Sequence, residues 1–169
     1  MANGQDILLV EDDLLDVELT LAALQQNPHP RKVTVVNNGE EALDYLYQRG
    51  KFETRAGGNP MLVLLDNKMP KITGLEVLKI MKADENLKSI PVVALTSSLE
   101  TPDLSEFYEY GVNAYVVKPV EYSEFIKVVK EIGLFWTEIN ETPVDTGEEK
   151  ASRRESLLEE YHRRRMSGE

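Results

Sequence analysis

The sequence predicts an α/β fold in which helices cover both faces of a doubly wound, five-stranded parallel sheet. Short apolar segments alternate with longer segments whose apolar residues recur at helical spacing, and five such β-then-α units fit between residues 7 and 132. The apolar segments lack the alternation of polar residues that a half-exposed strand shows. Strands buried on both faces, as in a parallel sheet, have this continuous apolar character.

The first two units occupy the N-terminal part of the chain. The apolar segment 7–10 predicts a strand, and residues 14–26 predict a helix that ends at Asn27-Pro28. The β-branched segment 32–36 predicts the second strand. After it, Asn37-Asn38-Gly39 is a turn that leads into the second helix.

The connection formed by residues 50–60 is longer than is usual in a compact α/β unit, so it predicts an exposed loop or an extension of the helix. The remaining strands and helices are predicted to alternate over residues 61–65, 75–82, 92–95, 103–110, 114–117 and 122–132.

The composition divides the chain near residue 141. Residues 1–140, including an extension over 131–140, are predicted to form one domain, and residues 141–169 a polar linker with a charged, partly helical tail. Ser152-Arg153-Arg154-Glu155 has the spacing of a helix capping box, and Arg163-Arg164-Arg165 follows it. A solvated tail and a helix that docks on a partner both fit this pattern.

Bulk properties narrow the class of protein. The net charge of −11 argues against a nucleic-acid partner. The absence of cysteine excludes disulfides and thiolate metal sites. Neither a signal peptide nor an apolar run long enough for a membrane span is recognisable, so we expect a cytoplasmic protein without a membrane partner.

Polar residues follow four of the predicted strands at their carboxyl ends. They are Glu11-Asp12, Asp66, Thr96 and Lys118. The carboxyl ends of parallel strands share one edge of a sheet, where ligands bind. Carboxylates there can hold Mg²⁺, and a lysine and a hydroxyl can contact a phosphoryl group. Alone, the acidic pair could instead serve a helix N-terminus.

These residues lie in segments that resemble the receiver domain of response regulators, the CheY-like family. The intervals also fit that family, since Thr96 lies 30 residues after Asp66 and Lys118 lies 22 after Thr96. The resemblance covers roughly residues 5–132 and implies a flavodoxin-like fold with strand order 2-1-3-4-5. The matching segments are VEDD (10–13), LLDNKMPKITG (64–74), ALTS (94–97) and NAYVVKP (113–119).

The resemblance implies a role for each acidic residue. Asp66 would accept a phosphoryl group from the phosphohistidine of a histidine kinase. Asp12, Asp66 and the backbone carbonyl of Lys68 would bind Mg²⁺ directly, and Glu11 would act through water. Asp13 would lie outside the core pair. The family acts in signalling and catalyses only its own phosphotransfer and slow dephosphorylation, so we expect no other enzyme activity.

The resemblance also implies how phosphorylation is sensed. Thr96 and Lys118 would contact the phosphoryl oxygens. Tyr115 would turn inward when Thr96 moves, which changes a protein-binding surface. The Lys118-Pro119 peptide is predicted to be cis, as this loop type favours.

Residues 131–143 and the long 50–60 loop resemble single-domain regulators that pair with bacterial phytochromes. This resemblance implies a bacteriophytochrome as the kinase, and a histidine phosphotransfer protein is a further candidate partner. Leu134, Phe135 and Trp136 form an apolar cluster that either folds back on the domain or forms a homodimer interface.

Other functions fit the sequence less well. A phosphatase of the haloacid-dehalogenase type needs a second aspartate where this chain has Lys68, and a nucleotide hydrolase needs a glycine-rich Gly-Lys-Ser/Thr loop that is absent. A pseudo-receiver, which signals without phosphate, is the serious alternative. Docking, phosphate relay and a phosphate sink all remain open as the output.

Overall fold

The computed structural model describes residues 6–142, 158–159 and 162–167. Its centre is a sheet of five parallel strands in the order β2-β1-β3-β4-β5, which confirms the predicted fold and strand order. The strands are β1 (Ile7–Val10), β2 (Val33–Val36), β3 (Leu62–Leu65), β4 (Val92–Thr96) and β5 (Ala114–Val117).

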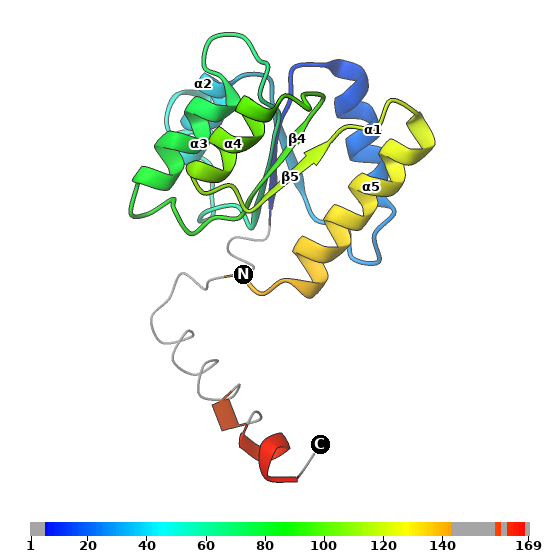
Figure 1. The fold of residues 1–169 in the computed structure, drawn as a ribbon. Helices are drawn as coiled ribbons and strands as arrows, with labels where there is room; N and C mark the ends of the chain where they lie inside the picture. The colour runs from blue at the N-terminus through cyan, green and yellow to red at the C-terminus, as the bar shows by residue number, and fades with distance from the viewer. Residues whose placement is uncertain (1–5, 143–157, 160–161, 168–169) are drawn as a thin grey trace.

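Five helices cover the two faces of this sheet. Helices α1 and α5 pack together on one face, and α2, α3 and α4 lie on the other, as Figure 1 shows. The helices are α1 (Leu14–Gln25), α2 (Gly39–Leu46), α3 (Gly74–Ala83), α4 (Thr101–Glu109) and α5 (Tyr122–Leu134).

The alternation of side chains along each strand divides the core into two clusters. In β1, Ile7 and Leu9 pack under α1 and α5, while Leu8 and Val10 pack under α2, α3 and α4. Strand β3 divides its residues in the same way. All residues of these two strands are buried, because each strand has neighbours on both sides and helices on both faces.

The strand register sets the position of the polar residues at the carboxyl edge. Val10 of β1 is paired with Leu65 of β3, so Glu11 and Asp66 leave the sheet at the same level. Strand β4 continues to Thr96, which is paired with Val117 of β5. The residue after Val117 is Lys118, so all of these side chains start from one edge.

The C-terminal extension continues α5 as a π-helical turn, Phe135–Ile139. Thr137 is buried in this turn and its Oγ1 donates to the carbonyl of Gly133 at 2.8 Å. Trp136 packs against the core beneath α1 and α5, whereas Leu134 and Phe135 are exposed. The cluster is therefore split: Trp136 folds back, and a role of the other two in dimerisation stays a prediction.

The 50–60 connection contains a short 3-10 helix, Gly50–Phe52, followed by mostly exposed turns. The guanidinium of Arg55 lies 4.1 Å from the ring centre of Tyr45. Its Nε donates to the carbonyl of Tyr45 at 2.9 Å, and its Nη1 to that of Gly58 at 3.0 Å. The side chain of Arg55 thus ties this long loop to the end of α2.

The described residues of the tail, 158–159 and 162–167, are helical and exposed. The capping-box segment 152–155 lies outside the described residues, and the domain boundary near residue 141 stays a prediction. None of the helices in the described ranges is both long and apolar enough to cross a membrane.

Candidate functional site

Three of the predicted acidic residues converge at the carboxyl edge of the sheet. Glu11, Asp12 and Asp66 each bring a carboxylate oxygen to within 4.8 Å of the others. Glu11 and Asp66 are buried, and Asp12 is exposed. Three oxygen donors this close, with one open to solvent, fit a hard divalent cation such as Mg²⁺ that keeps some of its waters.

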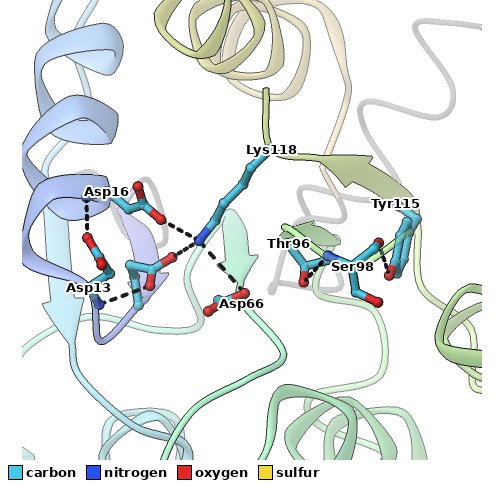
Figure 2. A network of polar contacts seen from close by, with 8 residues as sticks. Asp13, Asp16, Asp66, Thr96, Ser98, Tyr115 and Lys118 are labelled. Carbon is cyan, nitrogen blue, oxygen red and sulfur yellow. Dashed lines mark hydrogen bonds and ion pairs between the residues drawn. The ribbon is translucent and has the colours of Figure 1, made fainter. Parts of the chain in front are cut away.

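Lys118 reaches into this group of carboxylates from the end of β5. Its Nζ lies 2.5 Å from Oε2 of Glu11, 2.8 Å from Oδ2 of Asp16 and 3.8 Å from Oδ1 of Asp66 (Figure 2). The side chain of Lys118 is only 9% exposed. We call Glu11, Asp12, Asp16, Asp66 and Lys118 the carboxylate–lysine cluster.

Asp16 is a member of this cluster that the sequence analysis missed. Asp13 is the N-cap of α1, and its Oδ1 accepts a hydrogen bond from the backbone N–H of Asp16 at 3.0 Å. Glu11 in turn accepts from the N–H of Asp13. The sequence feature that could have indicated Asp16 is its position in the first turn of a predicted helix that begins at the same edge of the sheet.

A second set of polar contacts joins the ends of β4 and β5. The backbone N–H of Ser98 donates to Oγ1 of Thr96 at 3.3 Å, and the hydroxyl of Tyr115 donates to the carbonyl of Ser98 at 2.9 Å. The Oγ of Ser98 donates to Oδ2 of Asp103 in α4 at 2.6 Å. We call Thr96, Ser98, Asp103 and Tyr115 the hydroxyl chain; Figure 2 shows three of them beside the carboxylate–lysine cluster.

Sequence reasoning found Thr96 and Tyr115 but missed the residues that join them. Ser98 is buried and contacts both the predicted switch residues and α4. The ring of Tyr115 also packs edge-on against Phe107 of α4, with ring centres 5.4 Å apart. The sequence does place Ser98 two residues after Thr96, at the end of a predicted strand. The path of the loop that brings Ser98 to Tyr115 and α4 could not be predicted.

Burial sets the electrostatics of the cluster. It raises the pKa of Glu11 from its ordinary value of 4.5 to about 7, and the charge of Asp66 adds to this shift. Burial also raises the pKa of Asp66, although Lys118 opposes that shift. Burial alone would lower the pKa of Lys118, but its hydrogen bonds to Asp16 and Glu11 raise it overall. One lysine therefore does not balance the carboxylates, and a bound cation would relieve their repulsion.

The loop after β3 holds Asp66 against the start of α3. Oδ1 of Asn67 accepts from the N–H of Leu75 at 3.1 Å, and the carbonyl of Asn67 accepts from the N–H of Gly74 at 3.0 Å. A Cβ on Gly74 would lie 2.0 Å from the backbone oxygen of Asp66, so only glycine fits there. Lys68 is exposed in this loop, and ligation by its carbonyl stays a prediction.

The prediction of a cis Lys118-Pro119 peptide is wrong. No peptide bond between described residues is cis. The N–H of Lys118 donates to the carbonyl of Thr96 at 2.8 Å, which extends the pairing of β4 and β5 beyond the strand. The chain then continues with the trans isomer, which X–Pro bonds favour by about 0.5–1 kcal/mol.

Comparisons with known proteins agree with this fold. The model of the family described as response regulator receiver domain matches residues 7–130. The response regulator Rcp1 of Synechocystis is 37% identical over 132 residues, which cover 78% of this chain and 88% of that protein. A solved Mn²⁺-bound structure of Rcp1 is 36% identical, with a TM-score of 0.78, and the match covers 83% of this chain and 99% of that one.

Two further solved structures are similar. The phosphorylated cyanobacterial phytochrome response regulator RcpA is 38% identical, with a TM-score of 0.79, and the match covers 83% of this chain and 99% of that one. The bacteriophytochrome response regulator RtBRR is 48% identical, with a TM-score of 0.67, over 92% of this chain and 93% of that one. The chain belongs to the response regulator receiver domain family, and its close homologues include bacteriophytochrome response regulators.

Proposed function

We propose that this protein is a two-component response regulator that accepts a phosphoryl group on Asp66 from a histidine kinase. The supporting observation is the setting of that carboxylate. Asp66 directly follows a buried strand, lies 3.8 Å from the amine of Lys118, and has a carboxylate oxygen close to those of Glu11 and Asp12. This arrangement supplies both a nucleophile and the charges that phosphoryl transfer requires.

In the proposed reaction, a carboxylate oxygen of Asp66 forms a bond to phosphorus while the P–N bond of the kinase's phosphohistidine breaks. The electron pair of that bond stays on the imidazole nitrogen, which then takes up a proton. Lys118 neutralises charge on the phosphoryl oxygens and Thr96 offers a hydroxyl donor. Phosphate loss by hydrolysis returns the carboxylate, and no other enzyme activity is proposed.

The proposed cofactor is Mg²⁺, which would neutralise phosphoryl charge when bound. Asp12, Asp66 and the carbonyl of Lys68 would hold it, with Glu11 acting through water. The oxygen-rich donor set supports this assignment, as does the Mn²⁺-bound structure of the relative Rcp1.

The proposed output is a change in the surface near α4, β5 and α5. Thr96 would move toward the phosphoryl group and Tyr115 would follow through Ser98, because these residues form one hydrogen-bonded chain. The contact of Ser98 with Asp103 would carry the change to α4.

The proposed kinase is of the phytochrome type, on the support of the similarity to RcpA and RtBRR. A histidine phosphotransfer protein is a possible second partner in relay. A homodimer would use the exposed Leu134 and Phe135 beside α5. The pairing with a phytochrome-type kinase is tested by incubation with a phosphorylated bacteriophytochrome kinase and, separately, with an unrelated phosphorylated histidine kinase. Only the first should transfer phosphate within seconds to minutes.

The phosphoacceptor claim is tested by intact mass after incubation with Mg²⁺ and acetyl phosphate. The wild type should gain one phosphate, and Asp66→Asn or added chelator should abolish it. Asp84→Asn, which removes a carboxylate distant in the fold at the end of α3, is the matched control and should behave as the wild type does. No adduct on the wild type under any metal condition would favour a pseudo-receiver instead.

A further inference from the structure

Lys118 has two acidic partners that lie closer to its amine than Asp66 does. Its Nζ is within hydrogen-bond distance of Glu11 and Asp16, at 2.5 and 2.8 Å. The distance of 3.8 Å to Asp66 is too long for a hydrogen bond. In this state the amine therefore donates to two carboxylates, neither of which is the phosphoacceptor (Figure 2).

The two partners differ in how easily they can release the lysine. The side chain of Glu11 is 4% exposed, and that of Asp16 is 27% exposed. A buried carboxylate that loses its counter-charge also lacks water to replace it, so its release is costly. Asp16 can be hydrated after release. Asp16 is therefore the contact that Lys118 can exchange for a new anion.

Asp16 is also held firmly in its position. Its N–H is bonded to the N-cap Asp13, and α1 packs against α5, the helix that follows Lys118. Asp16 lies outside the trio of Glu11, Asp12 and Asp66 whose oxygens converge. A neutral side chain at residue 16 would therefore leave the candidate metal ligands unchanged.

We propose that Asp16 is a positioning residue. It binds the amine of Lys118 before phosphorylation and competes with the phosphoryl group for that amine afterwards. This inference rests on the proposed phosphorylation of Asp66. A phosphoryl group on Asp66 is a strong acceptor with more than one negative charge. To make that contact, the amine of Lys118 must move toward Asp66, which weakens its contact with Asp16. Asp16 therefore slows phosphorylation and shortens the lifetime of the phosphorylated state.

The test compares the wild type with Asp16→Asn, Asp16→Glu and the control Glu18→Gln. Glu18 is exposed on the same helix, so its variant makes the same change in charge at another position. Three quantities are measured: the rate of phosphate gain from acetyl phosphate at saturating Mg²⁺, the rate of phosphate loss after its removal, and the Kd for Mg²⁺.

Asp16→Asn should gain phosphate about three-fold faster and lose it about three-fold more slowly, the size expected from one partly screened charge contact. Its Kd for Mg²⁺ should change less than either rate. Asp16→Glu keeps the charge and should resemble the wild type, as should Glu18→Gln. The side-chain ammonium NMR signal of Lys118 in unphosphorylated Asp16→Asn should shift toward its position in the phosphorylated wild type.

A rate of phosphate gain in Asp16→Asn that equals or falls below that of the wild type, or a rate of phosphate loss that equals or exceeds the wild-type rate, would overturn the inference. If Asp16→Asn is phosphorylated more slowly and is also less stable than the wild type, the role of Asp16 is structural and the inference fails. A wild type that gains no phosphate would overturn the proposed function and this inference together. A wild type that gains phosphate on Asp66, with no change of rates in Asp16→Asn, would overturn this inference alone.

Discussion

The carboxylate–lysine cluster and the hydroxyl chain lie at the same edge of the sheet but are built differently. The first is held by short, charge-assisted contacts from Lys118 to Glu11 and Asp16, between side chains that directly follow strands or begin a helix. The second depends on a contact of 3.3 Å, on backbone groups of the loop after β4, and on a single hydroxyl-to-carboxylate contact from Ser98 to Asp103. Charge-assisted hydrogen bonds are roughly twice as strong as neutral ones.

This difference indicates that one part of the site is rigid and the other can rearrange. The carboxylate–lysine cluster is fixed by buried charges, so it is suited to hold reacting groups in place. The hydroxyl chain joins Thr96 and Tyr115 through neutral contacts with the loop residue Ser98, and only its contact with Asp103 of α4 involves a carboxylate. It contains no ion pair, so it can rearrange at a smaller cost in free energy. Variants that remove one contact from each region measure this contrast directly.

The largest effect is expected from Lys118→Met, which removes the only cation of the carboxylate–lysine cluster. The buried Glu11 then loses its counter-charge, and breaking a buried ion pair in this way costs about 3 kcal/mol. Chemical denaturation in chelator should show this loss, and phosphate gain from acetyl phosphate should fall sharply. A Lys118→Met protein as stable as the wild type would contradict the assignment of Lys118 as the anchor of the cluster.

The next effect is expected from Gly74→Ala, because the added Cβ would collide with the backbone oxygen of Asp66. The start of α3 must shift, with a loss of about 2 kcal/mol in the free energy of unfolding and a slower gain of phosphate. Gly133→Ala is the matched control, since its Cβ would meet side chains of Leu24 and Asn27 beside the C-terminal extension. It should lower stability but leave the phosphorylation rate unchanged.

A pH effect of intermediate size is expected from Glu11. Its pKa is raised from 4.5 to about 7 in the folded state, so between these values the folded protein binds more protons than the unfolded chain does. The free energy of unfolding without metal should therefore fall as pH rises through this window, by on the order of 2 kcal/mol. In Glu11→Gln, the free energy of unfolding should depend less on pH over the same range. A pH dependence equal to that of the wild type would contradict the assignment of this effect to Glu11.

The smallest effect is expected in the hydroxyl chain. Ser98→Ala removes the donor to Asp103 and should cost about 1 kcal/mol. Amide exchange should quicken at the start of α4, while the Tyr115 contact survives because it uses the carbonyl of Ser98. Ser123→Ala removes an exposed contact to Glu121 before α5 and should change little. A loss in Ser98→Ala as large as in Lys118→Met would erase the contrast between the two regions.

The sequence allowed the fold and the strand-end residues to be predicted because both depend on local patterns. An apolar segment followed by a polar residue is enough to place Asp66, Thr96 and Lys118 at one edge of a parallel sheet. Asp16 could not be found in this way, because its contact with Lys118 depends on how α1 packs against α5.

Loop geometry limited prediction in the same manner. The contacts of Ser98 and the close approach of Gly74 to Asp66 depend on the paths of two connections, which no periodicity encodes. The cis isomer predicted for the Lys118-Pro119 peptide was taken from the loop type alone and is wrong. Trp136 packs inward while Leu134 and Phe135 are exposed, since the π-helical turn changes which side chains face the core.

The most direct test of the central claim is to locate the phosphoryl group. The protein is incubated with Mg²⁺ and acetyl phosphate, the acyl phosphate is reduced with borohydride, and the peptides are sequenced by mass spectrometry. Reduction should convert Asp66 alone to homoserine, and the reaction should fail in the presence of chelator. Modification at Glu11 or Asp12 instead, or none at any carboxylate, would contradict the assignment of Asp66 as the phosphoacceptor.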